Sequence, residues 1–323
     1  MQESSIQDLE LNHIPVMSKE ILSYLNIESN GVYVDGTIGP GGHATPILNS
    51  LGKYGKLIGI DRDEEALKIC RKKLSNSSDQ ISLHHSSYNK IDAILSKEGI
   101  SCVDGVILDL GLSSNQLGAK RRGFSYRTNG DLDMRFDFST GEKASDIIRN
   151  NNVNELTKIF QIYGEERFSY RIARSIKEME EMKSVNHLRE AIRRCTPPKN
   201  RDRIFARIFQ SLRIAVNNEL EILQDFLLKF VDYLSPNGII AIISYHSLED
   251  RMVKHQYKHL SNISLLKILT KKPLSAAQTE IKNNKRSRSA KLRVARKKKK
   301  KKKAQKEMLE NKKSLFKRCH FSE

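Results

Sequence analysis

The chain has 323 residues, 38% hydrophobic content and a formal net charge of +19, which predicts a globular protein with one large domain and an insertion, or with two modest domains. No apolar run approaches the ~20 residues that cross a bilayer, and the polar N-terminus lacks signal-peptide features, so we expect a cytoplasmic protein without a membrane partner. The four cysteines lack paired spacing, which argues against disulfides and against a metal site: Cys70, Cys102, Cys195 and Cys319.

From residue 31 the sequence alternates strand-like and helix-like segments, which is typical of a parallel sheet covered by helices. Four near-continuous apolar runs predict strands that are buried on both faces: 32–35, 56–61, 81–85 and 103–109. Helices are expected over 44–52 and 64–74. The pattern predicts a doubly wound α/β domain.

The alternation stops over 115–210, where we predict an inserted helical domain. Phe168, Ile172 and Ile176 recur at a spacing of four residues, which gives a helix one apolar face. A long helical stretch over 209–234 then returns the chain to the sheet. The first domain is therefore discontinuous and comprises 1–114 and 211–296.

The C-terminal third predicts a fifth strand over 239–244, followed by a helix over 248–257. Ser247 and Asp250 stand at capping-box spacing at the start of this helix. The segments 265–270 and 291–296 are expected to close the sheet as edge strands.

A basic tail ends the chain. Residues 285–323 hold 18 Lys or Arg against 3 Glu, so +15 of the charge lies there and +4 on the preceding 284 residues. The stretch 297–323 is expected to be disordered when free and to neutralise phosphates on a polyanion. A merely solvated tail is an equal alternative, and charge alone does not separate RNA, DNA and an anionic membrane.

Polar residues follow four of the predicted strands: Asp35, Asp61, Asp109 and His246. Ligands of open α/β sheets bind beyond the carboxyl ends of the strands, where the strand order reverses. Each residue alone has an ordinary explanation as a turn or cap residue. Three carboxylates at successive strand ends favour a ligand site.

The loop after the first strand reads DGTIGPGGH, and its glycines allow close approach of the backbone to a ligand. Gly39, Gly41 and Ala44 satisfy a loose dinucleotide pattern, which is a weak signal. A dinucleotide places a pyrophosphate at such a loop, whereas S-adenosylmethionine places an ammonium and a sulfonium there. Asp35 beside the loop favours the cationic ligand.

Further residues suit a nucleoside and a reacting amine. Asp61 lies 20 residues after Gly41, where a carboxylate accepts hydrogen bonds from ribose hydroxyls. Tyr88 suits stacking on adenine, although a core tyrosine is the more frequent role. The segment 109–116 lies where amino-methyltransferases meet the reacting nitrogen, and a carboxylate there helps to orient an exocyclic amine. No cysteine stands there, which disfavours methylation of a ring carbon.

Long motifs in one order cover most of the chain, from His13 to about Arg296: DGTIGPGGH, LIGIDRDEEAL, DGVILDLGLSSNQL, RRGFSY with DLDMRFD, YGEERFSYRIARSI, FQSLRIAVNNEL, SYHSLEDRMVK and NKRSRSAKLR. With them the chain resembles the bacterial methyltransferase H family, also called MraW. That family methylates the exocyclic amine of a cytidine in small-subunit ribosomal RNA.

The resemblance implies a class I methyltransferase sheet with an inserted helical domain at 115–210 for RNA recognition. It also implies S-adenosylmethionine as cofactor and, as substrate, the N4 amine of a cytidine in the decoding region of 16S ribosomal RNA within the small subunit. The implied cofactor contacts are Gly41, Gly42, His43, Asp61, Tyr88, Asp109 and Gln116. Asp109 is the first catalytic candidate, and Ser113 and His246 are candidate neighbours of the target base.

The sequence departs from the family pattern at three places. Pro40 replaces a usual glycine, Asp131 replaces a common proline, and 203–207 replaces the usual His-Pro-Ala-Thr-Arg, so no catalytic role is assigned there. Arginines alternate with Phe124 and Tyr126 in the loop 121–135, which suits a grip on RNA by phosphate pairing and base stacking.

Three rival functions are weighed against this interpretation. A nicotinamide-dependent oxidoreductase has only the loose glycine pattern in its favour, and a non-enzymatic RNA-binding assembly factor has only the basic tail. A DNA amino-methyltransferase shares the chemistry but not the whole-chain motifs. The resemblance leaves a homodimer open.

Overall fold

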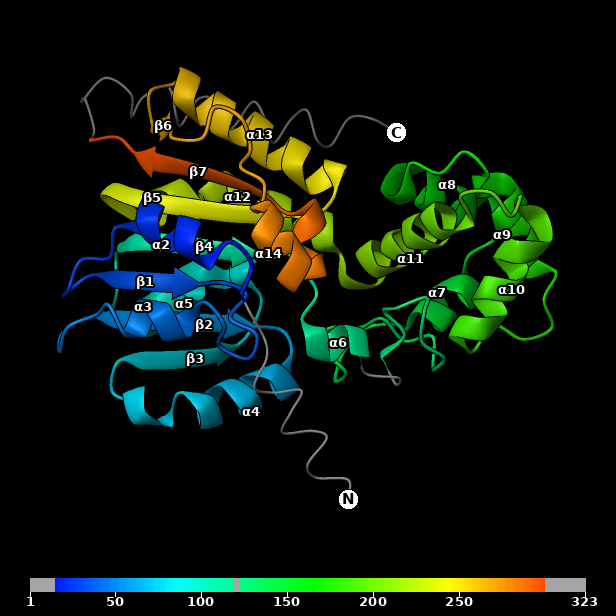
Figure 1. Ribbon diagram of the computed structural model, residues 1–323, viewed down its shortest axis with the longest axis horizontal. Helices are drawn as coiled ribbons and strands as arrows, with labels where there is room; N and C mark the ends of the chain where they lie inside the picture. Colours follow the sequence, from blue (N-terminus) through cyan, green and yellow to red (C-terminus); the bar gives the residue numbers. More distant parts are fainter. Residues whose placement is uncertain (1–14, 119–121, 300–323) are drawn as a thin grey trace. The chain divides into compact units, whose positions relative to one another are not determined.

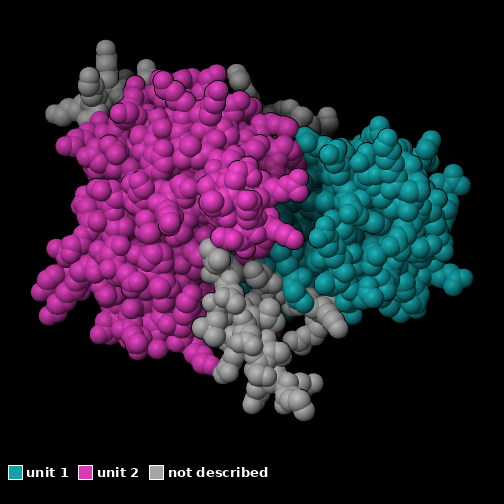
Figure 2. All heavy atoms as spheres, viewed as in Figure 1, with its two compact units in different colours: residues 1–13, 62–64, 112–222 teal, residues 14–61, 65–111, 223–323 magenta. Residues whose placement is uncertain are grey.

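The computed structural model describes residues 15–118 and 122–299, which form two compact units (Figure 2). The sheet unit consists of 15–61, 65–111 and 223–299, and the helical unit consists of 62–64, 112–118 and 122–222. The helical unit thus begins earlier and ends later than the predicted insertion at 115–210. The tail predicted to be disordered was 297–323, but Lys297 is buried and belongs to the strand Lys291–Lys297. The part of the tail beyond residue 299 lies outside the described residues.

The sheet unit is built on one seven-stranded sheet (Figure 1). Its strands are β1 Val32–Asp35, β2 Lys56–Asp61, β3 Ile81–His85, β4 Val103–Asp109, β5 Leu234–Ser244, β6 Leu266–Ile268 and β7 Lys291–Lys297. Their order is β3-β2-β1-β4-β5-β7-β6, and the first five are parallel. This is a doubly wound sheet whose order reverses between β1 and β4. The predicted class I methyltransferase fold and its first four strands are confirmed. The predicted burial of the third strand on both faces is wrong, because β3 lies at the edge of the sheet and its residues are partly buried or exposed.

The position of β7 differs from the prediction. β7 pairs antiparallel with β5 on one side and with β6 on the other, so only β6 lies at the edge. Leu292, Val294 and Ala295 are fully buried, and a strand of this kind needs a partner on each side. Because β7 runs opposite to the other strands of the central sheet, it begins at the carboxyl end of β5.

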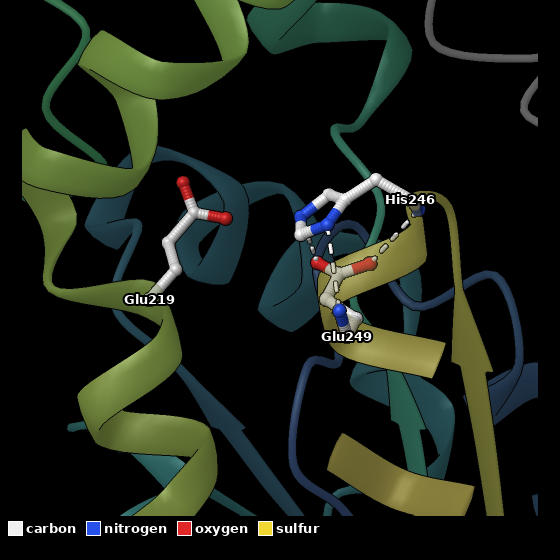
Figure 3. Close-up of side chains that lie close together, drawn as sticks. All are labelled: Glu219, His246 and Glu249. Atoms are coloured by element: carbon white, nitrogen blue, oxygen red, sulfur yellow. Dashed lines mark hydrogen bonds and ion pairs between the residues drawn. The ribbon is translucent and has the colours of Figure 1, made fainter. Parts of the chain in front are cut away.

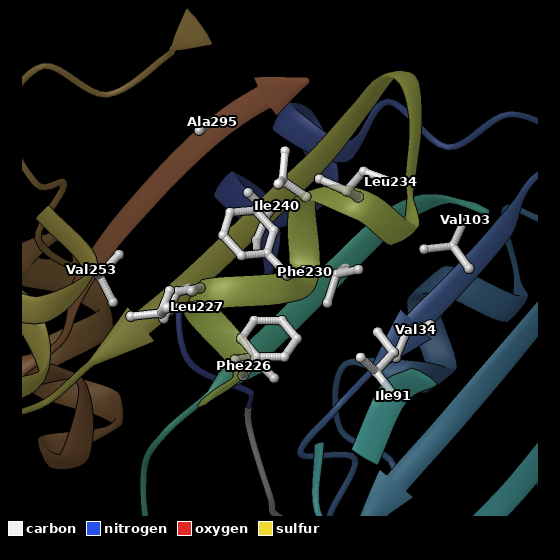
Figure 4. Packing of buried hydrophobic residues seen from close by; sticks show 14 of the residues in the cluster. Val34, Ile91, Val103, Phe226, Leu227, Phe230, Leu234, Ile240, Val253 and Ala295 are labelled. Atoms are coloured by element: carbon white, nitrogen blue, oxygen red, sulfur yellow. The ribbon is translucent and has the colours of Figure 1, made fainter. Parts of the chain in front are cut away.

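Helices cover both faces of the sheet: α2 Ser18–Leu25, α3 Ala44–Leu48, α4 Glu64–Lys73, α5 Ile91–Lys97, α12 Glu219–Tyr233, α13 Ser247–Asn262 and α14 Gln278–Asn283. One core packs α5, α12 and α13 against the sheet, and the other packs α2, α3 and α4 against the opposite face. In Figure 4, Phe226 and Phe230 of α12 lie beside strand residues such as Ile240.

Two predicted helix features are wrong in detail. The stretch 209–234 is divided between α11 Arg201–Asn217 and α12, because Asn218 takes a left-handed conformation with φ of 50°. Asparagine tolerates that conformation better than most residues, so it ends α11. At the start of α13 the capping box is formed by His246 and Glu249, one residue before the predicted pair of Ser247 and Asp250.

The helical unit contains α6 Ser114–Gly118, α7 Ala144–Asn150, α8 Val153–Gly164, α9 Ser169–Lys177, α10 Val185–Cys195 and α11. These helices enclose a core of their own. Ile172 and Ile176 of α9 are buried in it and Phe168 packs against it, which confirms the predicted apolar face. Within 15–118 and 122–299, no helix is both long and apolar enough to cross a membrane.

We expect Phe230→Ala to lower the free energy of unfolding by about 3–5 kcal/mol, because it leaves a cavity beneath the sheet. The Phe230 ring is fully buried and stacks on Phe226 with centroids 5.6 Å apart. Denaturant unfolding followed by circular dichroism measures the loss. Tyr54→Ala is the matched control, because Tyr54 is 73% exposed. Equal losses in the two variants would contradict this account of the core.

Candidate functional site

The loop after β1 joins the carboxyl ends of three strands. The Gly36 amide donates to a β4 carbonyl (2.9 Å), and the Ile38 amide donates to a β2 carbonyl (3.0 Å). Gly39 and Gly41 have φ values of 52° and 84°, a left-handed conformation that favours glycine. A Cβ on Gly41 would lie 3.1 Å from the Cys70 sulfur. The loop is therefore held in one shape that a side chain at Gly41 would disturb.

Asp35 and Asp109 end neighbouring parallel strands at the point where the strand order reverses. Thr37 links them: its amide donates to Asp35 Oδ1 (3.2 Å), and its hydroxyl accepts from the Asp109 amide (2.7 Å). Asp109 Oδ1 accepts from the Gly111 amide (3.1 Å), and Asp109 Oδ2 lies 3.6 Å from His43 Nε2. The structure thus brings together three residues that the sequence singled out, Asp35, His43 and Asp109.

The two carboxyl groups differ in protonation. Burial, with the charges of Asp109 and Asp61, raises the pKa of Asp35 to about 7, although His43 opposes the rise. Burial also acts to raise the pKa of Asp109, but His43 and the positive charge of Arg286 outweigh it and hold that pKa below the ordinary value. At neutral pH Asp109 is therefore ionised, and Asp35 is close to its midpoint.

Three buried polar atoms near this pair have no hydrogen-bond partner among the residues that the structure describes: Asp35 Oδ2, His43 Nε2 and the Tyr245 hydroxyl. The distance of 3.6 Å from His43 to Asp109 is too long for a hydrogen bond. Burial and the charge of Asp109 raise the pKa of Tyr245, so its hydroxyl stays protonated. Unsatisfied buried groups are costly, so this cluster favours a polar ligand that supplies a hydrogen-bond donor for Asp35 Oδ2 and an acceptor for the Tyr245 hydroxyl.

Asp61 ends β2, and its Oδ2 accepts a hydrogen bond from the Gly39 amide (2.7 Å). The predicted ribose carboxylate is therefore tied directly to the glycine loop. Gly42 is buried in the same loop. Tyr88 begins a turn after β3 and packs edge-on against Phe226, with ring centroids 5.5 Å apart. This contact fits the core role of Tyr88, and its contact with adenine stays a prediction.

Ser113 and Gln116 lie in the helical unit. The Ser113 hydroxyl accepts from the Gln116 backbone amide (3.1 Å), and the Gln116 side-chain oxygen Oε1 accepts from the Ser113 backbone amide (2.9 Å). This reciprocal pair caps the start of α6. Gln116 also donates to Asp63 (2.9 Å), which forms a buried ion pair with Arg122 at 2.8 Å. The predicted catalytic and cofactor roles of Ser113 and Gln116 stay predictions.

His246 caps the start of α13 (Figure 3). Its Nδ1 accepts from the Glu249 amide (3.4 Å), and its Nε2 lies 3.0 Å from the Glu249 carboxylate. The same carboxylate accepts from the Tyr245 amide (2.8 Å). Glu219, also drawn in Figure 3, pairs with Arg213 of α11 at 2.7 Å. His246 thus has a structural task, and its catalytic role stays a prediction.

Comparison with known proteins decides the family. The MraW methylase family matches residues 10–298. The chain belongs to this family. Ribosomal RNA small subunit methyltransferase H of Kosmotoga olearia is 44% identical over 289 residues, which is 88% of this chain and 97% of the relative. The protein of the same name from Trichormus variabilis is 44% identical over 296 residues, 91% of this chain and 94% of the relative.

A solved rRNA methylase from Streptococcus thermophilus aligns with a TM-score of 0.42 and 12% identity, over 87% of this chain and 95% of that chain. The family assignment depends on the sequence matches alone. As an MraW methylase, the chain uses S-adenosylmethionine as its methyl donor. The loop fits that cofactor, because the unpartnered Asp35 Oδ2 suits its ammonium and the left-handed glycines allow its close approach.

Three contributors to the site were not among the predicted site residues. Thr37 is the third residue of the DGT motif, and its spacing from Asp35 is a usable signal for a local hydrogen bond. Tyr245 directly precedes His246, and only its burial near Asp109 distinguishes it. Arg286 is far from Asp109 in the sequence, and no local pattern links the two.

We expect the affinity for S-adenosylmethionine to fall as the pH is lowered below about 7. The pKa of Asp35 is raised from 3.8 to about 7, so below that pH the carboxyl group is protonated and must release a proton to bind an ammonium. This coupling weakens binding by up to about tenfold per pH unit. Isothermal titration calorimetry measures the dissociation constant across this range. Asp35→Asn should bind weakly at every pH, and an unchanged pH slope in that variant would refute the role of Asp35.

Proposed function

We propose that this MraW methylase transfers a methyl group from S-adenosylmethionine to the N4 amine of a cytidine in the decoding region of 16S ribosomal RNA. The names of its relatives support ribosomal RNA of the small subunit as the substrate. The observation that carries the chemistry is Asp109, an ionised, partly buried carboxylate at the point where the strand order reverses. That is where a doubly wound sheet binds its ligands.

The cofactor is held by the loop after β1 and by the ends of β1 and β2. Asp35 Oδ2 accepts from the ammonium, which removes an unsatisfied buried atom. Gly41 and Gly42 offer backbone without a side chain. Asp61 accepts from the ribose hydroxyls while it holds Gly39. We assign the adenine contact to Tyr88, and Gln116 is a cofactor contact by resemblance alone.

Asp109 acts on the amine of the cytidine. Its ionised carboxylate accepts a hydrogen bond from the N4 amine and turns the nitrogen lone pair toward the methyl group. The cofactor supplies a methyl group on a positively charged sulfur. Transfer would join N4 to the methyl carbon and break the carbon–sulfur bond, with the electron pair left on sulfur. The methylated nitrogen then loses a proton to water, with Asp109 stabilising the positive charge.

The helical unit supports RNA binding. Tyr126 stacks on Phe205 with centroids 5.6 Å apart, and the exposed Arg127 lies over the Tyr126 ring at 5.6 Å. Such a column of aromatic and guanidinium planes suits unstacked bases. A paired cytosine hides its amine, so the target base has to leave its stack. Ser113 and His246 are proposed neighbours of that base, and a homodimer remains compatible with these assignments.

We expect Asp109→Asn to lower kcat about 10²–10³-fold, because it removes the charge but keeps an oxygen for the Gly111 amide. The unfolding midpoint should change little, and the dissociation constant for S-adenosylmethionine is measured beside kcat, because Asp109 is also an implied cofactor contact and its charge acts on Asp35. Asp79→Asn is the control, because Asp79 is an exposed carboxylate of the sheet unit. An Asp109→Asn enzyme with wild-type kcat would remove Asp109 from the mechanism.

The substrate is tested by transfer of labelled methyl from S-adenosylmethionine to unmodified small subunits, followed by nuclease digestion and mass analysis of the labelled nucleoside. Label on the exocyclic amine of cytidine is the expected result. Label on another nucleoside would overturn the proposed target. Binding of the cofactor without label in RNA would overturn the proposed substrate.

A further inference from the structure

The motif NKRSRSAKLR matched the family pattern, but the site described above uses only one of its residues. In the structure it forms the turn Lys285–Ser289 and the start of β7. We call this segment, with the sequence KRSRS, the basic turn. It holds Lys285, Arg286 and Arg288, and no acidic residue occurs between Glu280 and Glu307. It is therefore a concentrated positive charge at one place in the fold.

Topology brings the basic turn to the edge that carries the site. Lys291, the first residue of β7, pairs with Ser244, the last residue of β5. On the other side of β5, Ile243 pairs with Asp109 at the end of β4. The turn before β7 therefore lies at the carboxyl ends of the parallel strands. In Figure 1, β7 runs opposite to β1, and α14 lies beside its start.

The basic turn is rigid. The Asn284 carbonyl accepts from the amide (3.0 Å) and from the hydroxyl (2.8 Å) of Ser287. The Asn284 side chain accepts from the Arg286 amide (3.2 Å). Ser287 is fully buried, and Ala290 is buried in the core beneath the sheet. The cations are thus carried on a backbone that needs little further ordering to bind a ligand.

The cations of the basic turn lie at different depths. Arg286 is half-buried, and its charge helps to keep the pKa of Asp109 low. Lys285 and Arg288 are exposed, and neither has an ion-pair partner within the described part of the chain. Cations without a partner at the carboxyl edge of the sheet suit an anionic ligand. S-adenosylmethionine offers one carboxylate beside its ammonium and sulfonium, whereas a nucleic-acid backbone offers a phosphate at every nucleotide, so three neighbouring cations suit the backbone better.

We propose that the basic turn binds the phosphates that flank the methylated nucleotide, with Arg286 nearest the base and Lys285 and Arg288 on the backbone outside. The inference extends the proposed function, since it requires an RNA substrate at Asp109. A base that leaves its stack must be positioned through its backbone, and phosphate contacts set that position without reading sequence. Arg288 adds a planar guanidinium group, whose forked N–H donors can bind one phosphate through two hydrogen bonds.

The test removes the two exposed cations together. We expect the double variant Lys285→Ala and Arg288→Ala to raise KM for unmodified small subunits by on the order of tenfold, with kcat and cofactor affinity nearly unchanged. For single-stranded RNA, each lost phosphate contact flattens the plot of log affinity against log salt by about 0.7. Binding to protein-free small-subunit RNA measures that slope. Arg288→Lys, on an otherwise native chain, keeps the charge but not the planar fork, so it should keep the salt slope and lose part of the affinity.

The control removes the same charge from the opposite edge of the sheet, through Lys53→Ala and Lys56→Ala, both exposed and close to the start of β2. If the basic-turn variant matches this control in KM and salt slope, the proposal is wrong. A loss with assembled subunits but not with protein-free RNA would also overturn it, because the turn would then contact a ribosomal protein. Absence of RNA methylation by the wild-type enzyme would instead overturn the proposed function itself.

Discussion

The site depends on two carboxylates that end neighbouring strands, Asp35 fully buried and Asp109 partly buried. Asp35 and Asp109 lie where the strand order reverses, and Thr37 holds both through its amide and its hydroxyl. The two carboxyl groups do not ionise equally, because burial, with a smaller contribution from the charge of Asp109, raises the pKa of Asp35. His43 and Arg286 stabilise the charge of Asp109, and the pKa of Asp35 rises instead. Asp109 is thereby ionised and can accept a hydrogen bond from the target amine, whereas Asp35 ionises fully only when it binds the ammonium of the cofactor.

The surrounding fold maintains the difference in pKa between Asp35 and Asp109. The loop after β1 is bonded to β2 and β4, so Asp35 cannot move away from Asp109 without breaking backbone hydrogen bonds of the sheet edge. Arg286 comes from the far end of the chain because β7 enters the sheet against the direction of β5. Without that antiparallel strand, Asp109 would keep His43 but lose its second source of positive charge. The antiparallel pairing of β7 with β5 therefore contributes to the low pKa of Asp109.

Local sequence patterns predicted the features that depend on neighbouring residues, such as the strands and their ends. The strands β1, β2 and β4 are apolar runs that need burial on both faces, and Asp35, Asp61 and Asp109 follow from them as strand ends. The run that forms β3 looked alike in the sequence, but it lies at the edge of the sheet and is only partly buried. Helix boundaries were less predictable, because Asn218 in a left-handed conformation divides a continuous helical pattern. The cap of α13 was misplaced by one residue, since an imidazole nitrogen of His246 accepts the bond that a serine hydroxyl usually takes.

Contacts across the sheet have no signature in a single sequence. The segment 291–296 is readable as a strand, but its neighbours in the sheet depend on which hydrophobic faces remain uncovered after β1 to β5 have paired. The approach of Arg286 to Asp109 follows from that choice and not from any spacing. Position in the fold also distinguishes charges that count equally in the composition. Lys53 and Arg288 add alike to the net charge, yet only Arg288 lies at the carboxyl edge, where a polyanion has a reason to bind.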